Sequence, residues 1–312
     1  MTSEIYPTKR ENFKKKTVYL LGGTFLIVNL IIILIYSMFS NHVLLDDKFF
    51  LTNREYFAFI CGLIFFYFFG LYDDKFTLSA NTKLLFSIIL ISFIILIDNT
   101  LVINELKFSF LKTNVELRSF SIFFTILCVL LFTNALNMFD GINLQSGSYS
   151  ILIFFIFIYE SIFVNLSLVM ITSLSFVLFL NYKNKIYLGE SGIQLLAFII
   201  CYIFLKTESM NLNIFFADEI FLIMALPGLD MFRLFLLRIF SGKHPFKADR
   251  NHLHHYLCNF FTDFQTFLLI FSYIFVSIIL YKFFENKIIY LSLYITVYFI
   301  LITYLIKKIK NN

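Results

Sequence analysis

Histidine and cationic side chains are concentrated in one short segment of the chain. Four of the five histidines lie within twelve residues, and Lys, Arg and Asp residues alternate with them. These histidines are His244, His252, His254 and His255. Arginine binds phosphate oxygens through paired N–H groups, so this composition predicts a site for a phosphorylated ligand. Two alternatives remain open, a zinc site formed by the His-x-His-His run and a solvated basic loop.

Three carboxylates occur where apolar runs end or begin. Asp73 and Asp74 are adjacent at the end of the second run, and Glu190 lies between Gly189 and Gly192 at the start of the seventh. Adjacent carboxylates repel each other, so a divalent cation is their usual partner. Glycine lets the backbone approach a ligand closely, and the N–H groups at a helix start attract anions. Solvated helix ends are the alternative interpretation of these acids.

A polar stripe is predicted in the segment NALNMFDGINLQSG. Asn134, Asn137, Asp140 and Asn143 recur every three residues, which on a helix keeps them on one face. Such a face would bind a polar ligand near the membrane surface. Gly141 follows Asp140 and permits a tight turn. A helix end capped by Asp and Asn is the alternative.

The composition excludes most other classes of protein. Of the 312 residues, 60% are hydrophobic, 20% are aromatic and 14% are charged. Soluble domains carry about 25% charged residues, so we expect lipid to be the solvent for most of this chain. A soluble globular enzyme, a disordered chain and a nucleic-acid binder are excluded. The four cysteines are scattered, which predicts buried thiols rather than a metal site.

Ten apolar segments are long enough, or nearly so, to cross a lipid bilayer as helices. They are residues 20–39, 55–71, 84–98, 119–136, 149–160, 164–181, 192–206, 214–237, 265–281 and 287–306. We therefore predict an all-α polytopic membrane protein, with residues 1–312 forming a single membrane-embedded domain. With a cytoplasmic N-terminus, 17 of the 25 Lys and Arg residues, Arg233 and Arg238 among them, lie in cytoplasmic segments. The positive-inside rule favours this orientation, which also places the C-terminus and the polar clusters at the cytoplasmic side.

Together the clusters predict one cytoplasmic site for phosphoryl transfer. Carboxylates would hold Mg²⁺, with Mn²⁺ as an alternative, while asparagines bind a polar group and basic residues bind phosphate. The membrane below would hold a lipid tail. The alternative from another class is a secondary transporter, which would place ion-binding carboxylates at mid-membrane. Asp230, after Pro227-Gly228, is the clearest residue of that kind, and we expect a kinked helix to point its carboxylate into the site.

These segments resemble the motifs of the polyprenyl-phosphate N-acetylhexosamine-1-phosphate transferases. The matching strings are FGLYDDKFTL, NALNMFDGIN, YLGESG and PFKADRNHLHH, together with the basic opening TKRENFKKKTVYLLGG. They follow the family's order from about residue 8 to 257, and two further spans follow over 265–306. The histidine segment is similar to that of the bacterial undecaprenyl-phosphate N-acetylglucosamine-1-phosphate transferase branch. The peptidoglycan branch, which transfers phospho-N-acetylmuramoyl-pentapeptide, is the alternative within the family.

The resemblance implies that undecaprenyl phosphate attacks a UDP-N-acetylhexosamine, releases UMP and starts a lipid-linked cell-envelope glycan. It implies catalytic roles for Asp73, Asp74, Asp140, His252, His254 and His255, and an Mg²⁺ site of Asp73, Asp74 and Glu190. The implied substrate-binding residues are Lys15, Lys83, Asn134, Asn137, Asn143, Asn181, Tyr187 and Arg250. The implied place is the bacterial cytoplasmic membrane, with the active site facing the cytoplasm, and a homodimer is left open.

Two of the departures from the family pattern concern candidate site residues. Glu190 stands where the family has Asp, which lengthens the side chain by one methylene group. Asn143-Leu144-Gln145 stands where the family continues with Asp-Gly-Leu. We expect the changed residue at Asn143 to alter the choice of donor sugar.

Overall fold

The computed structural model describes residues 2–3, 18–40, 50, 52–210, 214–245 and 249–311. The helices are α1 (Gly22–Ser40), α2 (Asn53–Phe76), α3 (Ala80–Ile97), α4 (Ser121–Phe139), α5 (Gln145–Tyr159), α6 (Val164–Tyr182), α7 (Gly189–Ser209), α8 (Ala217–Phe240), α9 (Leu253–Leu257), α10 (Asp263–Phe283) and α11 (Lys287–Asn311). The strands are β1 (Thr2–Ser3), β2 (Val18–Tyr19), β3 (Glu105–Leu106) and β4 (Val115–Glu116), paired as β1–β2 and β3–β4.

All of the apolar segments expected to span a membrane are helical in the structure, so the all-α membrane architecture is confirmed. Within the described part of the chain, eight helices are long and apolar enough to cross a bilayer. The two other expected segments form shorter apolar helices, in α1 and α5. The number of ten spans and the orientation of the termini therefore stay predictions.

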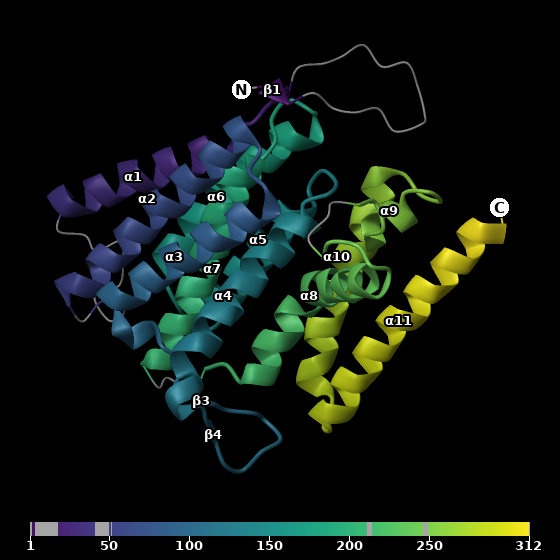
Figure 1. Ribbon diagram of the computed structural model, residues 1–312. Coiled ribbons are helices and arrows are strands. Elements are labelled where there is room, and N and C mark those ends of the chain that lie inside the picture. Colours follow the sequence, from purple (N-terminus) through teal and green to yellow (C-terminus); the bar gives the residue numbers. More distant parts are fainter. Residues whose placement is uncertain are drawn as a thin grey trace. The chain divides into compact units, whose positions relative to one another are not determined.

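The chain divides into two compact units. Unit 1 contains residues 1–78 and 146–200, and unit 2 contains residues 79–145 and 201–312. Within unit 1, α1 packs along α6 and α2 (Figure 1). Within unit 2, α4 packs against α8 and α3, while α10 packs against α8, α9 and α11. The predicted site residues are thus distributed over both units.

Capping residues set the ends of α2, which carries the acidic pair, and the start of α3. The Thr52 hydroxyl accepts a hydrogen bond from the N–H of Glu55 at 3.3 Å, which starts α2. α2 ends before Thr77, whose φ of 48° is the left-handed conformation that stops a helix. Ser79 then caps α3 by accepting a hydrogen bond from the N–H of Thr82 at 3.2 Å.

Buried polar contacts hold the β3–β4 end of unit 2 together. The Lys206 ammonium group on α7 donates to the Thr100 hydroxyl at 2.9 Å and lies 3.5 Å from Asp98. Asp218, at the start of α8, accepts hydrogen bonds from the hydroxyls of Ser109 and Tyr281. A buried charge is costly unless it is paired, so these contacts fix α7, α8 and α10 at this end.

Candidate active site

Asp74, in the last turn of α2, binds the N-terminus of α7. Its Oδ1 accepts a hydrogen bond from the N–H of Glu190 at 2.8 Å, and its Oδ2 accepts one from the N–H of Ser191 at 3.1 Å. The first N–H groups of a helix have no partner within the helix and carry partial positive charge. The Asp74 carboxylate therefore caps α7 from a different helix of unit 1.

Glycines allow three backbones to meet around the start of α7. A Cβ added at Gly70 of α2 would lie 2.5 Å from the Cα of Ser191. A Cβ at Gly23 of α1 would collide with the backbone nitrogen of Gly192. Because no side chain fits at either glycine, the YLGESG turn packs directly against α1 and α2.

Asp73 has a different environment from its neighbour Asp74. Its side chain is buried, and its Oδ1 accepts a hydrogen bond from the N–H of Leu78 at 2.7 Å. Successive helical residues point about 100° apart, so the two carboxylates leave α2 in different directions. The acidic pair is thus divided between closing the turn after α2 and capping α7.

The carboxylates of unit 1 suit a cation that takes few protein ligands. Among the residues described, no three His, Cys, Asp or Glu side chains converge to hold a metal ion, and this applies to the histidine run as well. Mg²⁺ usually keeps several waters and binds one or two carboxylates together with substrate phosphates. Asp74 accepts a hydrogen bond from the backbone N–H of Glu190, so the two residues that carry these carboxylates are in contact at the start of α7. This donor set fits Mg²⁺ completed by substrate oxygens.

Two of the predicted substrate ligands lie at the end of α6 and in the loop from α6 to α7. Asn181 is buried, and its amide donates to the carbonyl of Ile186 at 3.0 Å, which closes the loop. The N–H of Tyr187 donates to the carbonyl of Tyr19, and the Tyr187 carbonyl accepts from the N–H of Gly22, both at 3.0 Å. Asn181 thus supports the loop from inside, while backbone pairing with the start of α1 fixes Tyr187.

The polar stripe predicted along one helix face is interrupted in unit 2. α4 ends one residue before Asp140, whose φ of −78° and ψ of 52° are not helical. Asn134 and Asn137 lie on α4, whereas Asn143 lies in the turn that follows, so the prediction of one continuous face is wrong. The Asp-Gly pair ends the helix before the repeat is complete. The Asn134 amide donates to the carbonyl of Leu130 at 2.7 Å.

Gly141 brings this turn against the histidine segment. A Cβ at Gly141 would overlap the Nε2 atom of His254, so glycine is needed to leave room for the imidazole ring. Two motifs that are 113 residues apart in the sequence are therefore in contact within unit 2. Leu144, in the same turn, has a φ of +71°, a conformation that glycine adopts more easily.

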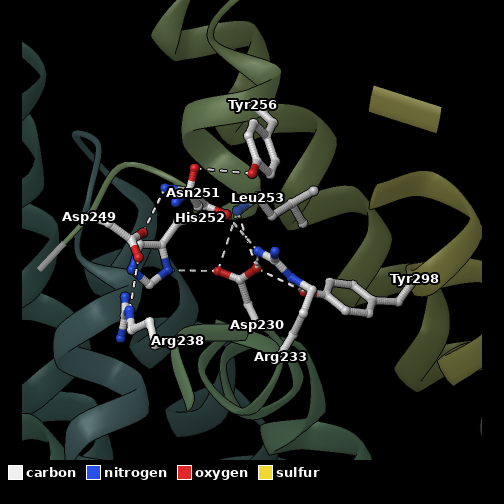
Figure 2. A network of polar contacts seen from close by, with 9 residues as sticks. All are labelled: Asp230, Arg233, Arg238, Asp249, Asn251, His252, Leu253, Tyr256 and Tyr298. Atoms are coloured by element: carbon white, nitrogen blue, oxygen red, sulfur yellow. Dashed lines mark hydrogen bonds and ion pairs between the residues drawn. The ribbon is translucent and has the colours of Figure 1, made fainter. Parts of the chain in front are cut away.

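Asp230 attaches the histidine segment to α8 (Figure 2). Its Oδ2 accepts a hydrogen bond from Nδ1 of His252 at 2.8 Å, and its Oδ1 accepts from Nη2 of Arg233 and the hydroxyl of Tyr298, both at 2.8 Å. The N–H of Leu253 lies 3.2 and 3.3 Å from the two oxygens. The carboxylate points toward the histidines, as expected, but both of its oxygens bind protein groups.

Two arginines that the sequence analysis counted as cytoplasmic loop charges are buried side chains of α8. Arg233 donates to the carbonyl of Asn251 at 2.6 Å, and Arg238 donates to Asp249 at 2.8 Å. The charge count did not reveal this burial: α8 continues to Phe240, and both guanidinium groups bind the histidine segment. Asp230 and Arg233 are three residues apart on a helix, and this spacing could have predicted that their side chains pair. Nothing in the sequence pointed to Tyr298.

The histidines of this segment differ in their surroundings. His254 is buried on α9, and burial lowers its pKa to about 3, with the neighbouring His255 and His252 rings acting in the same direction. Burial also lowers the pKa of His255, and His252 and Arg250 add to the effect. The rings of His252 and His254 are stacked at 5.4 Å between centroids, with an interplanar angle of 5°. His254 is therefore a neutral ring near pH 7.

The cationic residues predicted to bind substrate have different positions. Arg250 is exposed and follows Asp249. Burial alone would raise the pKa of Asp249, but the hydrogen bonds from Arg238 and the N–H of Asn251, together with the charges of Arg238 and His252, hold the pKa below its usual range. Lys83 is half-buried in the first turn of α3. Lys15 lies outside the described residues.

Comparison with known proteins finds a match between part of this chain and one protein family. Residues 56–208 match the family described as glycosyl transferase family 4. The undecaprenyl-phosphate alpha-N-acetylglucosaminyl 1-phosphate transferase of Escherichia coli strain K12 is 26% identical over 215 residues, which are 65% of this chain and 58% of the relative. The protein of the same name from Yersinia pestis is 28% identical over 215 residues, 65% of this chain and 59% of the relative. The chain thus spans less than two thirds of the length of these relatives.

The family match and the packing of the motifs agree. The matched region contains the acidic pair, the asparagine segment and the start of α7. The histidine segment lies beyond it, and Gly141 brings the asparagine segment into contact with His254. On these grounds the chain is similar to glycosyl transferase family 4, and its motifs resemble those of the polyprenyl-phosphate sugar-1-phosphate transferases.

Proposed function

We propose that this protein transfers an N-acetylhexosamine 1-phosphate from a UDP-sugar to undecaprenyl phosphate and releases UMP. The observation that carries the proposal is that distant motifs meet within each unit. Asp74 contacts Glu190 in unit 1, and Gly141 contacts His254 in unit 2. Carboxylates for a cation and a histidine-arginine segment for phosphates are the components that phosphoryl transfer requires.

The reaction joins two phosphate groups and therefore depends on neutralising negative charge. A phosphate oxygen of undecaprenyl phosphate bonds to the sugar-proximal phosphorus of the UDP-sugar, and the bond from that phosphorus to the bridging oxygen breaks. UMP leaves with the bonding electron pair, and the sugar keeps its anomeric oxygen. The second pKa of a phosphate is about 6, so the acceptor is largely ionised near pH 7 and needs little help from a base.

The acidic residues of unit 1 would act on the diphosphate through a cation. Asp74 and Glu190, with Asp73, would hold Mg²⁺, which when bound supplies positive charge at the phosphate oxygens. The Asp74 carboxylate also orders the first turn of α7. Its loss would therefore affect both the cation and the backbone that carries Glu190.

The polar residues of unit 2 would bind the phosphates and the nucleotide. Arg250 and His255 would donate hydrogen bonds to phosphate oxygens, and charge-assisted bonds of this kind are short and strong. Asn137 and Asn143 would bind the nucleotide. Asp140, exposed after the end of α4, would belong to the catalytic residues that the resemblance implies.

The donor we propose is UDP-N-acetylglucosamine or a modified relative. The relatives from Escherichia coli and Yersinia pestis are named as N-acetylglucosaminyl 1-phosphate transferases, which favours this donor over the muramoyl-pentapeptide donor of the peptidoglycan branch. We also propose that the protein lies in the bacterial cytoplasmic membrane with its active site facing the cytoplasm. Asn143, where the family has an acid, is the position at which we expect donor choice to differ.

The experiment is UMP release by the purified full chain with undecaprenyl phosphate, Mg²⁺ and a panel of UDP-sugars. We expect lipid-dependent release with UDP-N-acetylglucosamine or a modified relative. Asp74→Asn should reduce kcat by roughly 100-fold or more, because the amide offers one acceptor oxygen to α7 and removes a charge for the cation. Asp263→Asn, at the exposed start of α10, is the matched control and should stay within about twofold of the wild-type rate.

Folded wild-type protein that releases no UMP with any donor would contradict the proposal. Equal activity of Asp74→Asn and Asp263→Asn would leave the transferase reaction standing and remove the role given to Asp74.

A further inference from the structure

His252 is held at one of its two ring nitrogens. Nδ1 lies 2.8 Å from Oδ2 of Asp230, and the side chains of His252 and Asp230 are only 9% and 8% exposed. An ionised carboxylate can only accept hydrogen bonds, so Nδ1 must carry a proton. The second ring nitrogen, Nε2, is then left to act on a ligand.

The Asp230 carboxylate is itself fixed by two further side chains. Arg233 and Tyr298 both donate to Oδ1, so this oxygen is distinguished from Oδ2, which binds His252. The Tyr298 hydroxyl also accepts a hydrogen bond from Nε of Arg233 at 2.9 Å, which closes a ring of three side chains. A carboxylate held at both oxygens cannot rotate, and it therefore fixes the plane and the protonated nitrogen of the imidazole.

The C-terminal helix contributes directly to this arrangement. Tyr298 belongs to α11, far beyond the residues matched by the family, and it is fully buried. The sequence analysis treated the spans over 265–306 only as additions to the motif-bearing region. In the structure, the middle of α11 touches the carboxylate that holds the histidine segment.

We propose that Asp230, held by Arg233 and Tyr298, is a positioning residue that fixes the Nδ1–H tautomer of His252 and so presents Nε2 as a hydrogen-bond acceptor to a proton-bearing oxygen of the substrates, such as the P–OH of a singly ionised acceptor phosphate. The proposal rests on the proposed transferase function for the identity of the ligand. The tautomer itself is a property of the protein alone, so it can be tested whether or not that function holds.

The tautomer is read from the full chain labelled with ¹⁵N at both histidine ring nitrogens. Long-range ¹H–¹⁵N correlation spectra in alkaline buffer distinguish the protonated nitrogen of each neutral ring, and the His252 signals are those that a His252→Gln variant lacks. We expect the Nδ1–H form for His252 in the wild type. A dominant Nε2–H form would overturn the proposal.

Asp230→Asn is expected to reverse this tautomer while keeping the side-chain shape. The amide oxygen should take the position of Oδ1, where two donors converge, and the amide NH₂ then faces Nδ1 of His252. Nδ1 becomes an acceptor and the proton moves to Nε2. We expect kcat to fall by roughly 100-fold or more, as for other carboxylates that orient a catalytic histidine. An unchanged tautomer in folded Asp230→Asn would contradict the proposal.

Tyr298→Phe tests the same arrangement with a milder change. It removes the hydroxyl that supports Asp230 and leaves the ring in place, so we expect kcat to fall by about 3- to 10-fold with little change in KM. Tyr290→Phe is the matched control on α11, since its buried hydroxyl donates to the carbonyl of Ser277 at 2.8 Å instead. Tyr290→Phe should stay within about twofold of the wild type.

The kinetic comparison separates positioning from a general loss of stability. Equal effects of Tyr298→Phe and Tyr290→Phe on kcat would indicate a merely structural hydroxyl and overturn the role of Tyr298. If wild-type protein releases no UMP, the proposed function fails, whereas the NMR spectra still decide which nitrogen of His252 carries the proton.

Discussion

His254 and Arg250 lie four residues apart in one basic segment but differ in their exposure to water. The His254 ring is buried against Gly141, whereas Arg250 is exposed. A protonated imidazole in the position of His254 would lose its hydration and meet two neighbouring imidazoles. The folded protein therefore keeps this ring neutral, so Arg250 is the better candidate for binding phosphate charge.

The neutral state of His254 makes the stability of the protein dependent on pH. Its pKa is about 3 in the folded protein, below the value of about 6.5 expected for an unfolded chain. Between these values the unfolded chain binds a proton that the folded chain does not, so stability is lost as pH falls below about 6.5. We expect the wild type to lose on the order of 2 kcal/mol more stability between pH 7 and pH 5 than His254→Gln does.

Substrate-free protein in detergent micelles is suited to this comparison, with unfolding followed at both pH values. His244→Gln is the matched control, because His244 is exposed and should leave the pH dependence as in the wild type. An identical loss of stability in the wild type and His254→Gln would show that His254 takes up its proton as easily in the folded protein as in the unfolded chain.

At the scale of helices, the start of α7 depends on glycines in two other helices. Gly70 of α2 and Gly23 of α1 meet the backbone of the YLGESG turn without a side chain between them. The same face of α2 carries Asp74 one turn after Gly70, so close packing and the hydrogen bonds to α7 reinforce each other. Displacing α2 would weaken both.

Gly70→Ala should therefore lower both the stability of the protein and its rate of UMP release. An alanine in place of a helical glycine without close neighbours should not have these effects. The new Cβ would lie 2.5 Å from backbone atoms of Glu190 and Ser191, and overpacking of this kind costs about 1–3 kcal/mol. We expect UMP release to fall roughly 100-fold, because a shift of about 1 Å in catalytic groups has effects of that size. Thermal unfolding and the rate of release are the two measurements.

Gly228→Ala is the control for this prediction. Gly228 lies within α8, and no atom is found within 4 Å of its added Cβ. Alanine favours a helix over glycine by up to about 1 kcal/mol, so this variant should be as stable as the wild type or more stable. A Gly70→Ala variant that matches Gly228→Ala in both measurements would contradict the tight packing at α7.

The helices were predictable from sequence because long apolar runs have few alternatives in lipid. The acids at the ends of α2 and the start of α7 were also predicted, since they stand at the boundaries of those runs. The face of Asn134 to Asn143 was mispredicted, because a regular spacing cannot reveal that the helix ends before Asp140. The contact of Tyr298 with Asp230 depends on tertiary packing across 68 residues, which no local pattern encodes.

At the scale of the whole molecule, the orientation in the membrane decides where the chemistry takes place. The positive-inside rule predicts that Lys185, in the loop from α6 to α7, faces the cytoplasm, and that Lys112, between β3 and β4, faces the opposite side. The same rule predicts that the motif residues lie on the side of Lys185. The orientation therefore decides which pool of the proposed UDP-sugar donor the protein could reach.

Single cysteines in a background without the native cysteines test this orientation. Lys112→Cys should react with a membrane-impermeant maleimide in intact spheroplasts, whereas Lys185→Cys should react only after permeabilisation. The two positions serve as controls for each other. The reverse pattern would place the active site outside the cytoplasm, away from cytoplasmic UDP-sugars.

The hydrogen bond from α7 to Asp74 also has a consequence for biosynthesis. The bond joins residues that are 116 positions apart, and bacterial ribosomes add roughly 5–20 residues per second. The carboxylate at the end of α2 therefore enters the membrane surface roughly ten seconds before its partner on α7 has been made. During that interval Asp74 lacks its partners on α7, so water or lipid head groups have to solvate the carboxylate.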